Sequence, residues 1–317
     1  MTILNESSSF GDWAELWAKK KKVGMKYTYI RSINSFLNHL HPIYEIPVRK
    51  VKAIDIESII TELAVYNPNT KKPSSKKLLK NVKYAASSII EFAIKNCDTL
   101  YKNPANFVDI PLDAIKNTRT SLPLQEQELI MSTPHRARLS ALVMLTCGLR
   151  VGEMIALKWE NIDFENRVIY VRQSAYNING NKLKIKDGTK NGKTRNITIP
   201  NILYQPLWTE YMRKRNKTDF VSTKADGVSM HSRSSWKNMW DSYTKQLGIK
   251  FTAHQLRHTY ASMLYAAGVD VKSASELLGH SDVEITIKIY THLAKETKII
   301  SIVKYNQFLD DNFVTNN

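Results

Sequence analysis

The stretch that decides the fold is Leu277-Leu278-Gly279-His280-Ser281, which is followed by Ile289-Tyr290-Thr291-His292. A glycine after an apolar run is typical of a helix C-terminus, so a short helix over 270–278 should end at Gly279. Ser281 and Glu284 form a capping-box pattern, which predicts the start of another helix. The sequence therefore predicts two helices that meet at His280, the second of which carries Tyr290.

A further helix is expected upstream, in Phe251-Thr252-Ala253-His254-Gln255-Leu256-Arg257. Thr252 can cap this helix, Gln255 completes a capping-box pattern, and Gly268 marks its end. His254 and Arg257 are three residues apart, so they share a face near a helix N-terminus, which attracts anions. A single His-x-x-Arg pair most often only faces solvent. It indicates a functional site only in combination with other residues.

The run Cys147-Gly148-Leu149-Arg150-Val151 adds a second arginine to this set of two histidines and one tyrosine. Two guanidinium groups can hold and neutralise a phosphoryl centre. Imidazoles can exchange protons with its oxygens, and a phenol can be the nucleophile that attacks phosphorus. The residue types therefore indicate phosphodiester chemistry through a phosphotyrosine.

The composition indicates a polyanionic partner. The 317 residues carry a formal net charge of +17 at pH 7, and the isoelectric point is about 9.6. Residues 1–105 hold 17 Lys and Arg against 9 Asp and Glu, and the remainder holds 29 against 20. A basic tail would have concentrated this charge. A nucleic acid contacted by both halves is therefore a better interpretation than a merely soluble basic protein.

The first part of the chain predicts a helical domain over residues 1–105. Large apolar residues recur three and four positions apart, which predicts helices from near Phe10, over about 27–40, over 54–65 and over 74–96. A basic run at the start of the last helix includes Lys71, Lys72, Lys76 and Lys77. Such runs are usually solvated, but a helix N-terminus also offers free N–H groups, so phosphate contact is a second interpretation.

Residues 106–119 are expected to form a linker, because they show little periodicity and include Pro111. The second domain, 120–317, should be mostly helical with a small antiparallel sheet. Strand signals lie in 167–171, 182–185 and 195–200. The predicted class is thus mainly α with a small antiparallel β-sheet: a helical domain followed by an α+β domain.

The quoted motifs, in this order, resemble those of the tyrosine recombinase (phage integrase) family. The segment Thr146-Cys147-Gly148-Leu149-Arg150-Val151-Gly152-Glu153 is similar to the family's first arginine box. The resemblance covers residues from about 120 to 295, whereas the N-terminal part resembles the family's core-site-binding domain only in pattern. It implies a site-specific DNA recombinase or integrase that cleaves and rejoins strands through a 3′-phosphotyrosine intermediate.

The resemblance also implies roles for the motif residues. Tyr290 is expected to attack the scissile phosphate and to become bonded to the 3′ phosphate. Arg150 and Arg257 are expected to hold the non-bridging oxygens in the transition state. His254 and His280 are expected to hydrogen-bond the phosphate, with His254 as a candidate acceptor of the phenol proton.

The family also has a catalytic lysine in a β-hairpin. Lys190 aligns best, just before a predicted Asn191-Gly192 turn, and is expected to protonate the departing 5′ oxygen, with Lys193 as the alternative. Lys193 and Arg195 are otherwise expected to contact the DNA backbone. Glu153, which lies one turn past the first arginine, is expected to orient the site without touching substrate.

The expected partner is double-stranded DNA carrying recombination sites, bound by a homotetramer on paired sites. Accessory DNA-bending or directionality proteins are further candidate partners. An amphipathic helix over 293–309 is predicted either to dock on a neighbouring protomer or to pack on its own domain. No metal and no nucleotide cofactor is expected, because the sequence has no carboxylate cluster for magnesium and the ester to tyrosine conserves the bond energy.

Two alternatives stay open on the sequence: type IB topoisomerase-like relaxation of DNA, which uses the same chemistry, and a catalytically silent DNA-binding protein. The first helix begins near Phe10, which leaves no room before it for an arm-binding domain and favours a recombinase of Xer or short-integrase type. Mobile-element insertion, chromosome-dimer resolution and inversion are not distinguished.

Two cysteines, Cys97 and Cys147, give neither a disulfide framework nor a zinc spacing. Cys147 lies in an apolar helical run and is expected in the core. No apolar run is long enough to span a membrane, and the N-terminus lacks a signal-peptide core. A cytoplasmic, DNA-associated protein is therefore expected.

Overall fold

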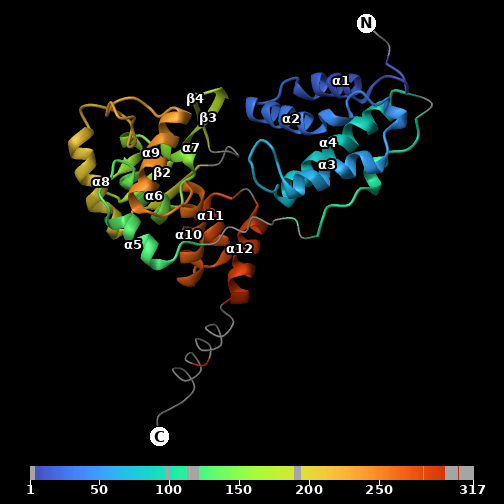
Figure 1. Cartoon of the computed structure of the whole chain (residues 1–317). Coiled ribbons are helices and arrows are strands. Elements are labelled where there is room, and N and C mark those ends of the chain that lie inside the picture. Colours follow the sequence, from blue (N-terminus) through green and yellow to red (C-terminus); the bar gives the residue numbers. More distant parts are fainter. Residues whose placement is uncertain are drawn as a thin grey trace. The chain divides into compact units, whose positions relative to one another are not determined.

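The computed structural model describes residues 4–97, 100–112, 114, 121–188, 194–280, 282–296 and 306 (Figure 1). The chain divides into two compact units, Met1–Thr118 and Arg119–Asn317. The division falls inside the segment 106–119 predicted as a linker. Each unit has its own cluster of buried apolar side chains. Within the described ranges, no helix combines the length and apolar character needed to cross a membrane.

The N-terminal unit is helical. Its described residues form α1 (Phe10–Lys22), α2 (Tyr27–Leu40), α3 (Ala53–Val65) and α4 (Lys76–Ile94), with short 3-10 helices η1 (His41–Ile43), η2 (Val48–Lys50) and η3 (Pro104–Phe107). Helix α4 packs against α1, α2 and α3. Its inner face is a stripe of buried apolar residues, Leu79, Val82, Ala85, Ala86, Ile89, Ile90 and Ala93. The apolar spacing therefore predicted these four helices to within a few residues.

The C-terminal unit is mostly helical and contains the strands. Its described helices are α5 (Leu124–Ser132), α6 (Arg138–Cys147), α7 (Val151–Ala156), η4 (Trp159–Asn161), α8 (Asn201–Lys214), α9 (Arg233–Leu247), α10 (Ala253–Ala266), α11 (Val271–Leu278) and α12 (Val283–Glu296). The predicted caps are present: Thr252 accepts the N–H of Gln255 at the start of α10, and Gly268 and Gly279 have positive φ after α10 and α11. Ser281 lies outside the described residues, and the Asp282 carboxylate accepts the Glu284 N–H at the start of α12.

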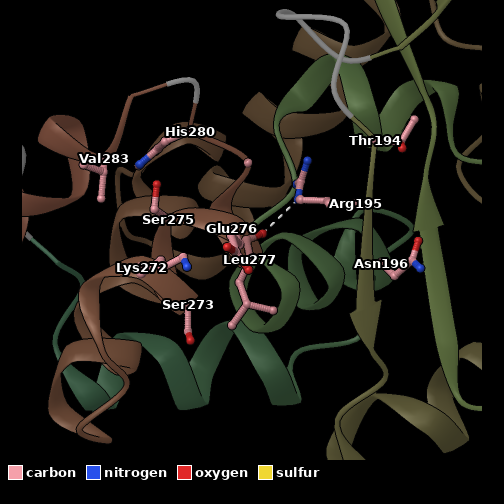
Figure 2. A pocket seen from close by; sticks show the side chains of 11 residues that line it. Thr194, Arg195, Asn196, Lys272, Ser273, Ser275, Glu276, Leu277, His280 and Val283 are labelled. Carbon is pink, nitrogen blue, oxygen red and sulfur yellow. Dashed lines mark hydrogen bonds between the residues drawn. The ribbon is translucent and has the colours of Figure 1, made fainter.

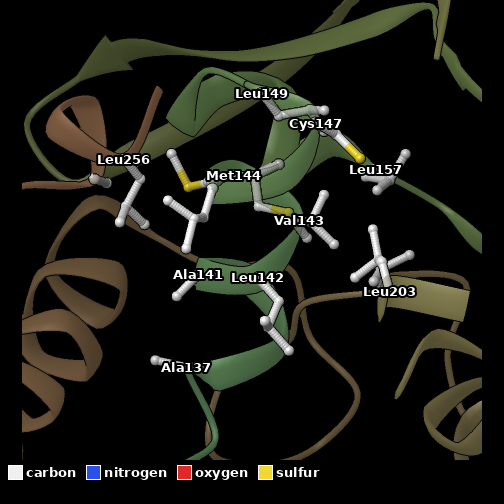
Figure 3. Close-up of a cluster of buried hydrophobic side chains, with 14 of the residues drawn as sticks. Ala137, Ala141, Leu142, Val143, Met144, Cys147, Leu149, Leu157, Leu203 and Leu256 are labelled. Atoms are coloured by element: carbon white, nitrogen blue, oxygen red, sulfur yellow. The ribbon is translucent and has the colours of Figure 1, made fainter. Parts of the chain in front are cut away.

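Helix α6 runs through the core of this unit and is apolar on nearly all sides (Figure 3). Val143, Met144 and Cys147 are fully buried, and residues from α8 and α10, such as Leu203 and Leu256, pack in the same cluster. Burial raises the pKa of the Cys147 thiol to about 12, so this thiol stays protonated. The prediction that Cys147 is a core residue is confirmed.

The strands form two sheets instead of the single small sheet that the sequence predicted. One sheet has the antiparallel order β1 (Ile162–Asp163), β2 (Val168–Val171), β5 (Arg195–Thr198), and the other pairs β3 (Gln173–Asn179) with β4 (Lys182–Asp187). Strand β3 was not predicted, because its residues are half-buried or exposed and show no alternation of apolar and polar types. The predicted Asn191-Gly192 turn lies outside the described residues.

Gly148 makes the sharp turn from α6 toward Arg150. Its φ is +64°, and a Cβ at this position would lie 2.3 Å from Cδ1 of Tyr260. An L side chain would therefore meet both a strained backbone and an aromatic ring in α10. Gly180, which joins β3 to β4, also has a positive φ, but a Cβ at that position would extend into open space.

We expect Gly148→Ala to destabilise the chain more than Gly180→Ala. The matched control Gly180→Ala incurs only the left-handed backbone penalty, about 1–2 kcal/mol. Gly148→Ala adds overpacking against Tyr260, on the order of 1–3 kcal/mol more. Thermal unfolding of the two full-length variants measures the difference. Equal losses of stability would show that Tyr260 moves aside without cost.

Candidate active site

Arg150 stands at the N-terminus of α7, directly after the Gly148 turn. Its Nη1 forms an ion pair with Oε1 of Glu153 at 2.8 Å, and its Nη2 donates to the carbonyl of Gly279 at 2.7 Å. The side chain retains 22% exposure, so Arg150 is only partly buried. Arg150 is thus fixed at two points and still accessible to an anion.

Arg257 lies in the second turn of α10 and is buried. Its Nη1 donates to the carbonyl of Gly148 at 2.6 Å, and its Nη2 donates to the carbonyl of Leu278. Burial and the nearby Arg150 lower the pKa of Arg257 to about 9, so its positive charge is disfavoured yet still present at neutral pH. A bound anion would relieve this destabilisation.

Arg195 extends from β5 into the same region. Its Nε donates to the carbonyl of Leu277 at 2.8 Å, the bond drawn in Figure 2, and its Nη2 pairs with Oε2 of Glu153 at 2.8 Å. Only 9% of the residue is exposed, and its Nη1 has no hydrogen-bond partner among the described residues. The sequence predicted a contact with the DNA backbone. That contact stays a prediction, and the bonds of the buried side chain hold other groups of the site.

Glu153 is the carboxylate that joins two of these arginines. Its side chain is fully buried, and its oxygens accept from the backbone N–H of Arg150 at 2.9 Å as well as from both guanidinium groups. Burial alone would raise the pKa of Glu153, but the hydrogen bond and charge of Arg195, followed by those of Arg150, lower it to about 2. Glu153 therefore stays ionised and holds Arg150 and Arg195 in place, and its role in orienting the site for a substrate stays a prediction.

The three arginines all donate to the C-terminal end of α11. The carbonyls of Leu277, Leu278 and Gly279 accept from Arg195, Arg257 and Arg150 in turn. These carbonyls have no partner within their own helix and lie at its negative end. Gly279 also leaves the space for this arrangement, because a Cβ there would lie 2.9 Å from Nη1 of Arg195.

His280 follows this helix end directly and is half-buried. Its backbone N–H donates to the carbonyl of Ser275 at 3.0 Å, and its Nδ1 lies 2.8 Å from Oγ1 of Thr286. Burial, and then the charges of Arg257 and Arg150, lower the pKa of His280 to about 4. The imidazole is therefore neutral at physiological pH.

His254 is exposed in the first turn of α10, three residues before Arg257. It is close enough to His280 to contribute to the lowering of the pKa of that histidine. The two predicted histidines are therefore in one region together with the two predicted arginines.

Tyr290 is carried by α12 and is buried, with 7% exposure. Its hydroxyl donates to the carbonyl of Val269 at 3.1 Å, and its ring packs edge-to-face on Tyr265 at 5.0 Å between centroids. Burial, and then the charge of Asp270, raise the pKa of the phenol. The carbonyl of Val269 therefore holds this hydroxyl in the structure.

An open cavity of about 720 Å³ lies between α11 and β5, beside His280 (Figure 2). Arg195 lines one side of it and Lys272 the other. The cavity therefore combines positive groups with access from solvent, next to the arginine cluster.

The remaining predicted residues belong to the N-terminal unit or lie outside the described residues. Lys190 and Lys193 belong to the latter group. In the N-terminal unit, Lys71 and Lys72 are exposed in the loop before α4, while Lys76 and Lys77 are in its first turn.

One residue of the site was missed by the sequence analysis. Thr286 is fully buried on α12 and contacts His280. The sequence feature that could have identified Thr286 is its position four residues before Tyr290, which places both residues on one side of a helix.

Comparison with known proteins agrees with this geometry. The model of the phage integrase family matches residues 121–297. The tyrosine recombinase XerC-like protein of Caldanaerobacter subterraneus subsp. tengcongensis is 27% identical in an alignment 314 residues long. The alignment covers 88% of this chain and 77% of that protein. Tyrosine recombinase XerA of Pyrococcus furiosus is 36% identical over 179 residues, which cover 54% of this chain and 55% of that protein.

The fold also agrees with a solved structure. The Tn1549 transposon integrase in complex with transposon right end DNA superposes with a TM-score of 0.74 at 20% identity, over 94% of this chain and 99% of that one. The family match spans more than half of the chain and includes each motif from Arg150 to Tyr290. The chain therefore belongs to the phage integrase family of tyrosine recombinases, enzymes that cleave and rejoin DNA strands.

Proposed function

We propose that the arginine cluster binds the scissile phosphate of a specific DNA site and that Tyr290 is the nucleophile. The observation that carries this proposal is the charge of the cluster: three guanidinium groups meet at the end of α11, and Glu153 pairs with two of them. The excess positive charge is partly buried, where it favours an anion strongly. The partly exposed side chain of Arg150 is where a phosphodiester can enter.

The proposed cleavage step is a transfer of the phosphoryl group from one oxygen to another. The phenol oxygen of Tyr290 forms a bond to phosphorus, the bond from phosphorus to the 5′ oxygen breaks, and the DNA keeps a 3′-phosphotyrosine. His254 accepts the phenol proton, and Lys190 donates a proton to the departing 5′ oxygen. The reverse steps with a different 5′ hydroxyl rejoin the strand, so no nucleotide is consumed.

Arg150 and Arg257 stabilise the charge that develops on the phosphate oxygens. Their fixed positions at the end of α11 mean that they need not reorganise during the reaction. His280, which is neutral, contributes a hydrogen bond to a non-bridging oxygen. Glu153 and Arg195 do not touch the substrate in this scheme and keep Arg150 in place.

The proposed partner is duplex DNA, contacted by both units. Lys71, Lys72, Lys76 and Lys77 offer exposed or half-exposed charges in the N-terminal unit, and Lys193, which lies outside the described residues, is a further proposed contact. Exchange between two duplexes requires four strand cleavages, so four protomers with one Tyr290 each make a complete assembly. We also propose accessory DNA-bending or directionality proteins as further partners. The proposed location of the protein is in the cytoplasm, associated with DNA.

We expect Tyr290→Phe to bind DNA and to form no covalent adduct, because the variant keeps the ring and loses the attacking oxygen. Duplex fragments from the source genome, nicked to trap the intermediate, are incubated with wild type and variant and resolved on denaturing gels. An adduct that persists in the variant would identify another nucleophile.

We expect Arg150→Lys to reduce the cleavage rate by roughly 10²- to 10³-fold, as for the loss of one preorganised oxyanion donor. Lysine keeps the charge but cannot bridge Glu153 and the Gly279 carbonyl while facing a phosphate. DNA affinity should change little. Arg213→Lys, at a site where the arginine side chain is 63% exposed, is the matched control. If DNA affinity and cleavage rate fell by the same factor, Arg150 would only bind the DNA backbone and would not stabilise the transition state.

We expect Glu153→Gln to lower the free energy of unfolding by about 3 kcal/mol near neutral pH, because it leaves buried guanidinium charges without their partner. The pKa of Glu153 is about 2 in the folded chain against an ordinary 4.5, so its contribution is complete above 4.5 and is lost as pH falls toward 2. Urea unfolding at several pH values should show the two proteins converging over that interval. Glu160→Gln, at an exposed site, is the control. A difference that is independent of pH would contradict the ion-pair explanation.

A further inference from the structure

Thr286 connects the phosphate-binding region to the helix of the nucleophile. Its Oγ1 lies 2.8 Å from Nδ1 of His280, and the residue has no exposed surface. Tyr290 is four residues further along α12, so the two side chains lie on the same side of that helix. A buried hydroxyl that meets a histidine ring nitrogen holds the orientation of the ring, and the direction of their hydrogen bond depends on which ring nitrogen carries the proton.

The surroundings of His280 restrict it to the neutral form. Burial lowers the pKa of His280 most, and the neighbouring Arg257, Arg150, Arg195 and His254 lower it further, so a positive charge on this ring is disfavoured. A neutral imidazole carries one N–H, on either Nδ1 or Nε2. The oxygens of a phosphodiester only accept hydrogen bonds, so His280 can bind a phosphate only as the tautomer with the proton on Nε2. In that tautomer Nδ1 is an acceptor.

A threonine hydroxyl is a suitable partner for that acceptor. Histidine ring nitrogens are often held by carbonyls or carboxylates, which accept and therefore force the proton onto the nitrogen they face. A hydroxyl can donate its hydrogen bond to the ring nitrogen that it faces. That nitrogen then carries no proton, and the proton of the neutral ring is on the other nitrogen. The contact between Thr286 and His280 therefore allows the tautomer that a phosphate requires, where a carbonyl at the same place would oppose it.

We propose that Thr286 is a positioning residue for the cleavage reaction: its hydroxyl donates to Nδ1 of His280 and keeps the proton of that ring on Nε2, ready for a phosphate oxygen. This inference rests on the proposed function of the arginine cluster. Because α12 carries both Thr286 and Tyr290, the placement of one helix determines the tautomer of the histidine and the location of the nucleophile.

The hydrogen bond is tested directly on full-length wild-type protein by ¹⁵N NMR of the histidine rings, with His280→Ala to assign the signal. The expected spectrum shows a neutral ring protonated at Nε2. Thr286→Val keeps the shape of the side chain without its hydroxyl and should mix the two tautomers, while Thr286→Ser should preserve the wild-type state. A wild-type ring protonated at Nδ1 would overturn the proposal whatever the enzyme activity.

The catalytic consequence is tested by a double-mutant cycle on a nicked duplex that carries a cleavage site mapped with the wild-type protein. Thr286→Val should slow cleavage roughly 10- to 100-fold, the range for loss of an outer partner that orients a histidine. DNA affinity should be unchanged, and Thr286→Ser should restore the rate to within a few-fold. In a His280→Ala background, Thr286→Val should cause no further loss.

Each outcome of this cycle has a defined meaning. Equal losses with and without His280, or a Thr286→Ser variant as slow as Thr286→Val, would show that Thr286 only supports packing and would overturn the proposal. If wild type forms no adduct with any fragment of the source genome, the proposed function fails. The tautomer measured by NMR then still decides whether Thr286 donates to His280.

Discussion

The site depends on the C-terminal end of α11, where three successive carbonyls each accept from a different arginine. The arginines come from α10, from β5 and from the start of α7, which are distant in the sequence. Guanidinium groups repel one another, so their convergence requires acceptors at fixed positions. The unsatisfied carbonyls of a helix end, with its partial negative charge, provide these acceptors without adding mobile side chains.

Glu153 holds part of this arrangement in place and neutralises only part of its positive charge. One buried carboxylate holds Arg150 and Arg195 in place, but it does not neutralise three cations. The site is therefore stable enough to fold and still favours an added anion. The lowered pKa of Arg257 and the neutral state of His280 have the same physical origin, which is positive charge in a region with little water.

Much of this could be predicted from the sequence, because helices with caps and apolar spacing are local features. Thr252, Gly268 and Gly279 define their helix ends as expected. The burial of Arg195 has a signal in the sequence, because Arg195 alternates with Ile197 and Ile199, which are also buried, and a period of two places all three on the inner face. The hydrogen bond from Tyr290 to the Val269 carbonyl was not predictable, because it depends on how α12 packs on its neighbours. Lys190 and Lys193, outside the described residues, stay predictions from the motif alone.

The central claim is that Tyr290 and the arginine cluster act on one phosphate. Its most direct test is mass spectrometry of the peptide that remains attached to DNA after a trapped cleavage, with the linked DNA end identified in the same sample. The account predicts a phosphodiester between the oxygen of Tyr290 and a 3′ phosphate, with a free 5′ hydroxyl on the other strand end. Attachment through another residue, or to a 5′ phosphate, would contradict it.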